Sequence, residues 1–212
     1  MSADVYPSIE TGKLVADVAI GEWHRGVREP PGAGSERIDT YIRGSLGLGW
    51  GSVEVGTDAR PDIPYQHNGD FEWCGAFAAF CWSAAGLHSW YRSRCLPSTA
   101  RLLRWSSPID GPATRDNYWG NARRRIALKD IRPGDIVVVG PAGSTAGKHI
   151  TLATSFFCDG EVDTVEGNHP GRGPTGDRYE GVTTDRRRTK ATSAAAPRIL
   201  YAVRPLAADL EP

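Results

Sequence analysis

The sequence predicts an α+β fold, with helices in the first half of the chain and an antiparallel β-sheet in the second. Up to about residue 105 apolar residues recur at helical spacing, whereas after residue 131 short β-rich runs alternate with turn residues. At 212 residues the chain fits one domain that buries a real core. We therefore expect a single domain over residues 1–212. Its parts are a helical region with a loop (1–70), a central helix with a further helix after it (71–105), and the sheet (131–205).

Four segments have helical character. The first spans residues 13–25 and stops at Gly26, and the second spans residues 35–46. Residues 71–87, with the sequence FEWCGAFAAFCWSAAGL, are the most apolar segment of the chain and predict a buried central helix. A short helix is expected at residues 98–105, directly after a proline.

Four β-rich runs predict the strands of the sheet: 135–140, 149–157, 161–166 and 198–203. Two glycine-rich linkers, 140–147 and 167–181, lie next to them. Each linker is either the rim of an active site or an ordinary surface loop, because loops often carry functional residues but many are only connections.

Composition excludes several classes of function. Twenty-five basic residues balance twenty-five acidic ones, so no global field favours a nucleic-acid partner. No apolar run approaches the roughly 20 residues that span a bilayer, and the N-terminus lacks the basic-then-apolar order of a secretory signal. We expect a protein that is made in the cytoplasm, and that reaches any site outside it through cell lysis or a specialised secretion machine.

The cysteines have the spacing of reduced thiols rather than of a disulfide scaffold, and they are Cys74, Cys81, Cys95 and Cys158. The sequence also lacks the clustered Cys and His pairs at short spacing that a zinc site needs. We therefore expect neither a metal nor a cofactor.

Cys74 lies in the first turn of the predicted central helix, with Asp70 in position to cap it. The helix dipole and the free backbone N–H groups at this end favour a thiolate, and the N–H of Cys74 can meet a developing oxyanion. On the helix pattern alone, a small buried core residue is an equally good interpretation of Cys74. Cys81 lies inside the same helix and is interpreted as a core residue.

His149 opens an alternating run directly after a glycine-rich linker, which is where a strand presents a base at the mouth of a cleft. The other histidines have no comparable setting, and they are His24, His67, His88 and His169. A lone histidine is more often structural. The interpretation of His149 therefore depends on its neighbours in the sheet.

A two-residue hairpin turn at positions 159–160 identifies those neighbours. It pairs Ala153 with Glu166, so odd positions of the first strand share a face with even positions of the second. Glu166 and Asn168 then both lie on the face of His149. Either side chain can accept the imidazole N–H and hold its tautomer. A register shift of two residues keeps both on this face and changes only which is nearer.

Four short motifs follow one another along the chain: WCGAF (73–77), RPGDIV (132–137), the strand led by His149, and EGN (166–168). Their order resembles that of the CHAP-type amidases and peptidases, which are similar to the NlpC-type branch of the papain-like superfamily. The resemblance implies a papain-like core, with a cysteine-bearing helix packed on the sheet, and hydrolysis of peptidoglycan amide bonds. It also implies that Cys74 is the nucleophile, His149 the base, Glu166 the orienting acid and Asn168 a supporting polar residue.

The chain departs from the usual CHAP pattern at two points. Trp73 stands where glutamine commonly precedes the cysteine, and Ile-Thr (150–151) follows the histidine where Val-Gly is common. The first departure leaves the second oxyanion donor open. Tyr65 and Gln66, in the loop before the helix, are the candidates.

The resemblance implies the stem peptides of peptidoglycan as the substrate and leaves two cleavage types open. One is an N-acetylmuramoyl-L-alanine amidase, and the other is an endopeptidase of the stem peptide or cross-link. As alternatives, the same thiol chemistry serves an acyltransferase or deamidase that acts on a protein, and an inactive hydrolase fold serves as a binding module. A wall hydrolase without a signal peptide fits a phage lysin or a secreted antibacterial effector, with a delivery or immunity protein as partner.

Overall fold

The computed structural model describes residues 6–28, 36–45, 73–84, 86, 102–103, 106, 124–144, 147–190 and 196–210. Within these ranges the α-helices are α1 (Ile9–His24), α2 (Glu36–Ser45) and α3 (Cys74–Ala84). The strands are β1 (Arg125–Ile126), β2 (Ile136–Gly140), β3 (His149–Ala153), β4 (Glu161–Arg172), β5 (Arg178–Arg188) and β6 (Arg198–Val203). Two 3₁₀ turns, η2 (Leu128–Asp130) and η3 (Ala207–Leu210), complete the described elements. The predicted α+β class is confirmed.

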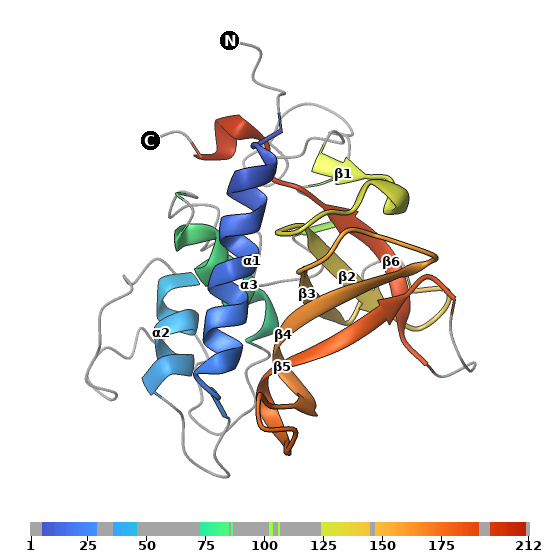
Figure 1. The fold of residues 1–212 in the computed structure, drawn as a ribbon. Coiled ribbons are helices and arrows are strands. Elements are labelled where there is room, and N and C mark those ends of the chain that lie inside the picture. The colour runs from blue at the N-terminus through green and yellow to red at the C-terminus, as the bar shows by residue number, and fades with distance from the viewer. Residues whose placement is uncertain are drawn as a thin grey trace, which may run out of the picture.

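The strands form one sheet in the order β1-β6-β2-β3-β4-β5, and every neighbouring pair is antiparallel. The helices lie together beside this sheet, and the long β4–β5 hairpin reaches past the other strands (Figure 1). None of the described helices combines the length and the apolar character that crossing a membrane requires.

Helix α3 is the central helix of the fold. It contacts β3 and β4 as well as α1 and α2, so apolar neighbours surround it. Its sequence explains this position, because CGAFAAFCWSA contains no charged residue and its small side chains permit close packing. Phe77 and Trp82 are each only 1% exposed, and Cys81 is fully buried. Burial raises the pKa of the Cys81 thiol, which fits its interpretation as a core residue.

The turn before β2 fixes α1 against the sheet. A Cβ atom on Gly12 of α1 would lie 2.3 Å from the carbonyl oxygen of Pro133, so only glycine permits this approach. Asp135 is buried and accepts two hydrogen bonds of 2.7 Å from the guanidinium of Arg204. The RPGDIV motif is therefore a structural corner that joins helix and sheet.

The helix boundaries differ slightly from the predicted ones. Helix α1 begins at Ile9, four residues early, because the Oγ atom of Ser8 accepts the backbone N–H of Thr11 at 3.1 Å and caps the helix. The expected cap Asp70 and most of the expected helix at 98–105 lie outside the described residues.

Two predictions about the sheet are wrong. The first strand of the central hairpin ends at Ala153 rather than at residue 157. The expected linker 167–181 is mostly strand, because β4 continues through Arg172 and β5 starts at Arg178. Charged residues hid this strand pair from the sequence pattern.

Candidate active site

Cys74 is the first residue of α3. The carbonyl of Trp73 accepts the N–H of Phe77 at 2.9 Å, so the N–H groups of Cys74 and the next two residues have no acceptor within the helix. Cys74 is 4% exposed, and its thiol lies close enough to His149 to raise the pKa of that imidazole. The predicted position of Cys74 in the first turn of the central helix is confirmed.

His149 is the first residue of β3, and its ring links Cys74 to Glu166. The Nε2 atom of His149 lies 3.0 Å from Oε2 of Glu166. Because an ionised carboxylate only accepts, Nε2 carries the proton of this bond, and Nδ1 is the ring nitrogen outside it. Burial alone lowers the pKa of His149, but the hydrogen bonds with Cys74 and Glu166 outweigh burial and raise it to about 9. The imidazolium form is therefore favoured at neutral pH.

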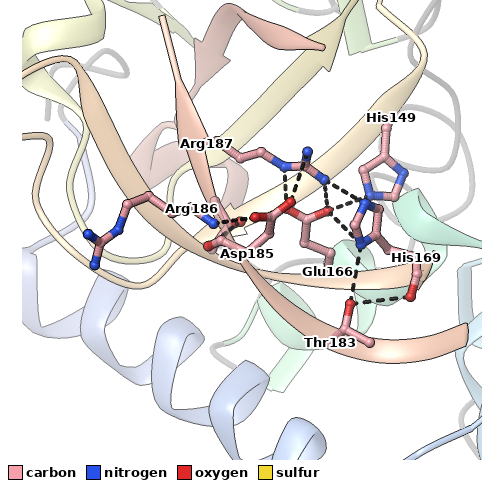
Figure 2. Close-up of polar contacts among 8 residues, drawn as sticks. His149, Glu166, His169, Thr183, Asp185, Arg186 and Arg187 are labelled. Atoms are coloured by element: carbon pink, nitrogen blue, oxygen red, sulfur yellow. Dashed lines mark hydrogen bonds and ion pairs between the residues drawn. The ribbon is translucent and has the colours of Figure 1, made fainter. Parts of the chain in front are cut away.

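Glu166 is fully buried and accepts hydrogen bonds from three side chains (Figure 2). Besides His149, these are Thr164, whose Oγ1 lies 2.6 Å from Oε1, and Arg187, whose Nε lies 2.6 Å from Oε1. Arg187 also donates from Nη2 to Oε2. Burial alone raises the pKa of Glu166, but the hydrogen bonds from His149 and Arg187 and the Arg187 charge hold it well below its usual range.

Two residues of this network, Arg187 and His169, were not among the predicted site residues. The Nη2 atom of Arg187 lies 2.9 Å from Nε2 of His169, and Nη1 lies 3.1 Å from a carboxylate oxygen of Asp185. Since a guanidinium only donates, Nε2 of His169 is the acceptor and this imidazole is neutral. Burial lowers the pKa of His169, which agrees with the neutral form.

The face predicted for Glu166 is confirmed, but its register is shifted by two residues. Ala153 pairs with Thr164 rather than with Glu166. The turn itself forms as expected, with a bridge between Cys158 and Glu161. The shift arises between the turn and the ladder, where the N–H of Phe157 bonds to the carbonyl of Ile131 instead of to β4. Glu166 consequently lies nearer the His149 end of β3.

A β-bulge in β4 then turns Asn168 away from the face of His149, and His169 takes the place on that face that was predicted for Asn168. Glu166 pairs with Thr183 and His169 pairs with Gly181, so β4 holds one extra residue here. Asn168 adopts a left-handed conformation with φ of 56° at this point, which asparagine tolerates better than most residues. Beyond the bulge the odd position 169 shares the face of Glu166. Within the described residues the Asn168 side chain forms no hydrogen bond with His149, and the Gly-Asn pair is the one local signal of a bulge.

Gly167 explains the middle of the EGN motif. A Cβ atom at this position would lie 2.6 Å from Cβ of Phe77 and 2.6 Å from the ring of Trp73. Such contacts are far inside normal packing distances, so glycine is what allows β4 to approach the start of α3. This approach places Glu166 beside the helix end that carries Cys74.

A pocket of about 250 Å³ borders the network where β2 ends and β3 begins. Its polar lining includes His149, His169 and Arg187. Oxygen and nitrogen atoms of Glu166, His169 and Asp185 lie within 4.8 Å of one another, which is a spacing that suits a cation. Arg187 contacts all three, so a guanidinium is the cation of this cluster. The candidate oxyanion donors Tyr65 and Gln66 lie outside the described residues.

The arrangement suits nucleophilic attack on a carbonyl. A thiol at a helix start contacts an imidazole, and a buried carboxylate orients that imidazole. No protein-family model, curated protein or solved structure matches the chain. The chemistry of the site is therefore assigned from its own geometry.

Proposed function

We propose that this chain is a cysteine hydrolase with a papain-like core that cleaves amide bonds of peptidoglycan. The observation that carries the chemical part is that Cys74 opens a buried helix close to His149, whose ring is hydrogen-bonded to the buried Glu166. The substrate class rests on the order of four motifs that resembles CHAP-type enzymes. The two parts are separable, and the experiment below tests both.

In the first step His149 holds the proton of Cys74, and the resulting thiolate attacks the carbonyl carbon of the amide. The carbonyl π electrons move to oxygen, and the tetrahedral oxyanion forms near the first N–H groups of α3, which have no acceptor within the helix. The helix dipole stabilises this negative charge, as it stabilises the thiolate before attack.

In the second step His149 gives its proton to the leaving amine as the carbon–nitrogen bond breaks, which leaves a thioester on Cys74. The neutral imidazole then accepts a proton from water, and the hydroxide equivalent attacks the thioester. The second tetrahedral intermediate then collapses and releases the carboxylic acid and the Cys74 thiolate. His149 still holds the proton from water, so the starting thiolate–imidazolium pair is restored. Glu166 keeps its hydrogen bond to Nε2 throughout, so the ring always presents Nδ1 to the reacting atoms.

Two cleavage types belong to the proposal, an amidase that separates sugar from stem peptide and an endopeptidase within the peptide. The enzyme acts on the cell wall, either as a phage lysin or as an antibacterial effector that a secretion machine delivers. An immunity or delivery protein is the expected partner in the second setting.

Cys74→Ala is expected to lower the rate at which soluble fragments are released from purified peptidoglycan by roughly 10⁴-fold or more, because no other group replaces the nucleophile. The measurement is mass analysis of the fragments that wild type and variant release. A new free amine on alanine together with a new free carboxylate on the sugar's lactyl group indicates an amidase. New peptide termini indicate an endopeptidase.

Cys158→Ala is the matched control, because Cys158 is an exposed thiol at the far end of the β3–β4 connection. It should digest the wall like wild type. Digestion by Cys74→Ala at the wild-type rate would overturn the assigned nucleophile. A wild type that leaves peptidoglycan intact but deamidates or acylates a protein would replace the substrate class and keep the thiol chemistry.

A further inference from the structure

We infer that Arg187 is a positioning residue of this site: it keeps the buried Glu166 ionised and oriented toward His149 through the whole catalytic cycle, and His169 holds Arg187 in place. The inference deepens the proposed function and rests on it.

The buried Glu166 carboxylate needs a permanent counter-ion. Glu166 is 0% exposed, and an ionised carboxylate in such a place is stable only beside a cation. His149 cannot be that cation permanently, because it loses its proton to the leaving amine in every turnover. Arg187 stays protonated at all accessible pH values. Arg187 is therefore the lasting counter-ion of Glu166, and without it the carboxylate would be unpaired whenever His149 is neutral.

Arg187 also fixes the orientation of the Glu166 carboxylate. Arg187 donates from Nε to Oε1 and from Nη2 to Oε2, which is the two-bond geometry that fixes the plane of a carboxylate. Thr164 occupies a further site on Oε1 at 2.6 Å. His149 meets Oε2 at 3.0 Å within this fixed plane. A rotation of the carboxylate would break at least two of these bonds, so Glu166 holds the imidazole in one position.

Arg187 itself comes from β5, where it lies opposite Val162 of β4. Its Nη2 atom also meets the neutral His169 at 2.9 Å, and its Nη1 atom meets Asp185 at 3.1 Å (Figure 2). All three guanidinium nitrogens are thus engaged. A lysine ammonium in the same place keeps the charge but lacks the planar fork.

The expected pH behaviour depends on the charged and titratable groups that the described residues place around Glu166. They are His149 on β3, His169 on β4, and Asp185 and Arg187 on β5. Cys74 on α3 acts on Glu166 only through His149. From His149 to Arg187 the charges alternate, because the Glu166 carboxylate lies between the imidazolium and the guanidinium. When Arg187 is removed, Glu166 takes up a proton at higher pH, the imidazolium loses its partner, and the thiolate is lost with it.

The test measures the rate of Cys74 alkylation by iodoacetamide from about pH 4 to about pH 9 in wild type, Arg187→Met and Arg187→Lys. We expect the acid limb, where the rate falls as pH is lowered, to move up by roughly one to three pH units in Arg187→Met. Arg187→Lys should move it in the same direction by less. Because Arg187→Lys retains a buried cation, it decides the question if Arg187→Met does not fold.

Arg124→Met is the matched control. Arg124 is also a buried arginine with two hydrogen bonds to one carboxylate, Asp209, at 2.8 and 2.7 Å, but it lies beside β1 at the opposite edge of the sheet from β5. The Arg124→Met variant should have lower thermal stability, and the acid limb of its Cys74 alkylation rate should stay at the wild-type pH. An unmoved limb in the Arg187 variants, or an equal movement in Arg124→Met, would overturn the inference alone. A wild-type Cys74 no more reactive than a free thiol would overturn the proposed function, and the inference with it.

Discussion

Replacement of Glu166 by glutamine is expected to lower kcat/KM for wall fragments by about 10³- to 10⁴-fold, the scale seen when a histidine loses its orienting carboxylate. The carboxylate accepts from His149, Thr164 and Arg187 with both oxygens. A glutamine offers one oxygen and one NH₂ group, so its NH₂ must face at least one of these donors. The imidazole then loses its fixed tautomer, and the buried Arg187 loses much of its partner.

The same substitution also changes the pH profile. On the alkaline side, wild-type kcat/KM should fall as pH rises past about 9, where His149 loses the proton that it must give to the leaving amine. Since the hydrogen bond and charge of Glu166 help to raise this pKa, the alkaline limb of Glu166→Gln should move down toward the ordinary value of about 6.5. Steady-state kinetics on a soluble wall fragment across this pH range gives both quantities.

Glu161→Gln is the control for this experiment. Glu161 lies on the same strand and also pairs with an arginine, with an Nε atom of Arg188 at 2.6 Å, but it is partly exposed and outside the site. We expect its activity and its alkaline limb to match wild type. A Glu166→Gln enzyme within about tenfold of wild type, or with its alkaline limb still near pH 9, would show that Glu166 does not orient His149.

Gly167→Ala is expected to lower kcat/KM by about 10²-fold or more, although residue 167 touches neither substrate nor His149. The added Cβ atom would lie 2.6 Å from both Phe77 and Trp73 at the start of α3. The Cβ atom of Phe77 is fixed to the helix backbone and the Trp73 ring is packed, so neither can yield by so much and the helix must move away from β4. Cys74 moves with it and separates from His149. The overpacking should also lower the free energy of unfolding by roughly 1–3 kcal/mol, measured in urea.

Gly21→Ala tests whether this loss is specific. Gly21 lies within α1, and nothing occupies the space within 4 Å of an added Cβ atom there. Alanine favours a helix over glycine, so this variant should be as active as wild type and at least as stable. Wild-type activity in Gly167→Ala would mean that the contact between β4 and α3 does not set the distance from Cys74 to His149.

The sequence predicted the parts of the site that depend on local rules. Cys74 opens a helix because an apolar segment begins there, and His149 opens a strand because an alternating run begins there. The face of Glu166 followed from the parity of a hairpin. Its register did not, because the residues after Thr154 leave the ladder and the N–H of Phe157 bonds to Ile131, which is distant in sequence.

The rest of the site depends on long-range pairing. In the sequence, the charged residues of β5 are typical of a solvated segment. Their role is visible only when β5 is paired with β4. There Arg186 meets Asp163 and Arg188 meets Glu161, each at a distance of 2.7 Å or less. Arg187 points to the other face and reaches Glu166. Alternate arginines opposite alternate carboxylates are a signal of strand pairing, but only after the partner strand is known.

The central claim is that Cys74 is an activated nucleophile, and the chain contains its own reference thiol. Cys158 is exposed, and its hydrogen bond with Asp159 raises its pKa, whereas Cys74 is only 4% exposed. The measurement is competitive alkylation of the folded wild type by iodoacetamide near neutral pH, followed by peptide mass analysis of both sites. The account predicts that Cys74 reacts faster than Cys158 by about tenfold or more, despite its burial. Modification of Cys158 first, with Cys74 protected until the protein unfolds, would contradict it.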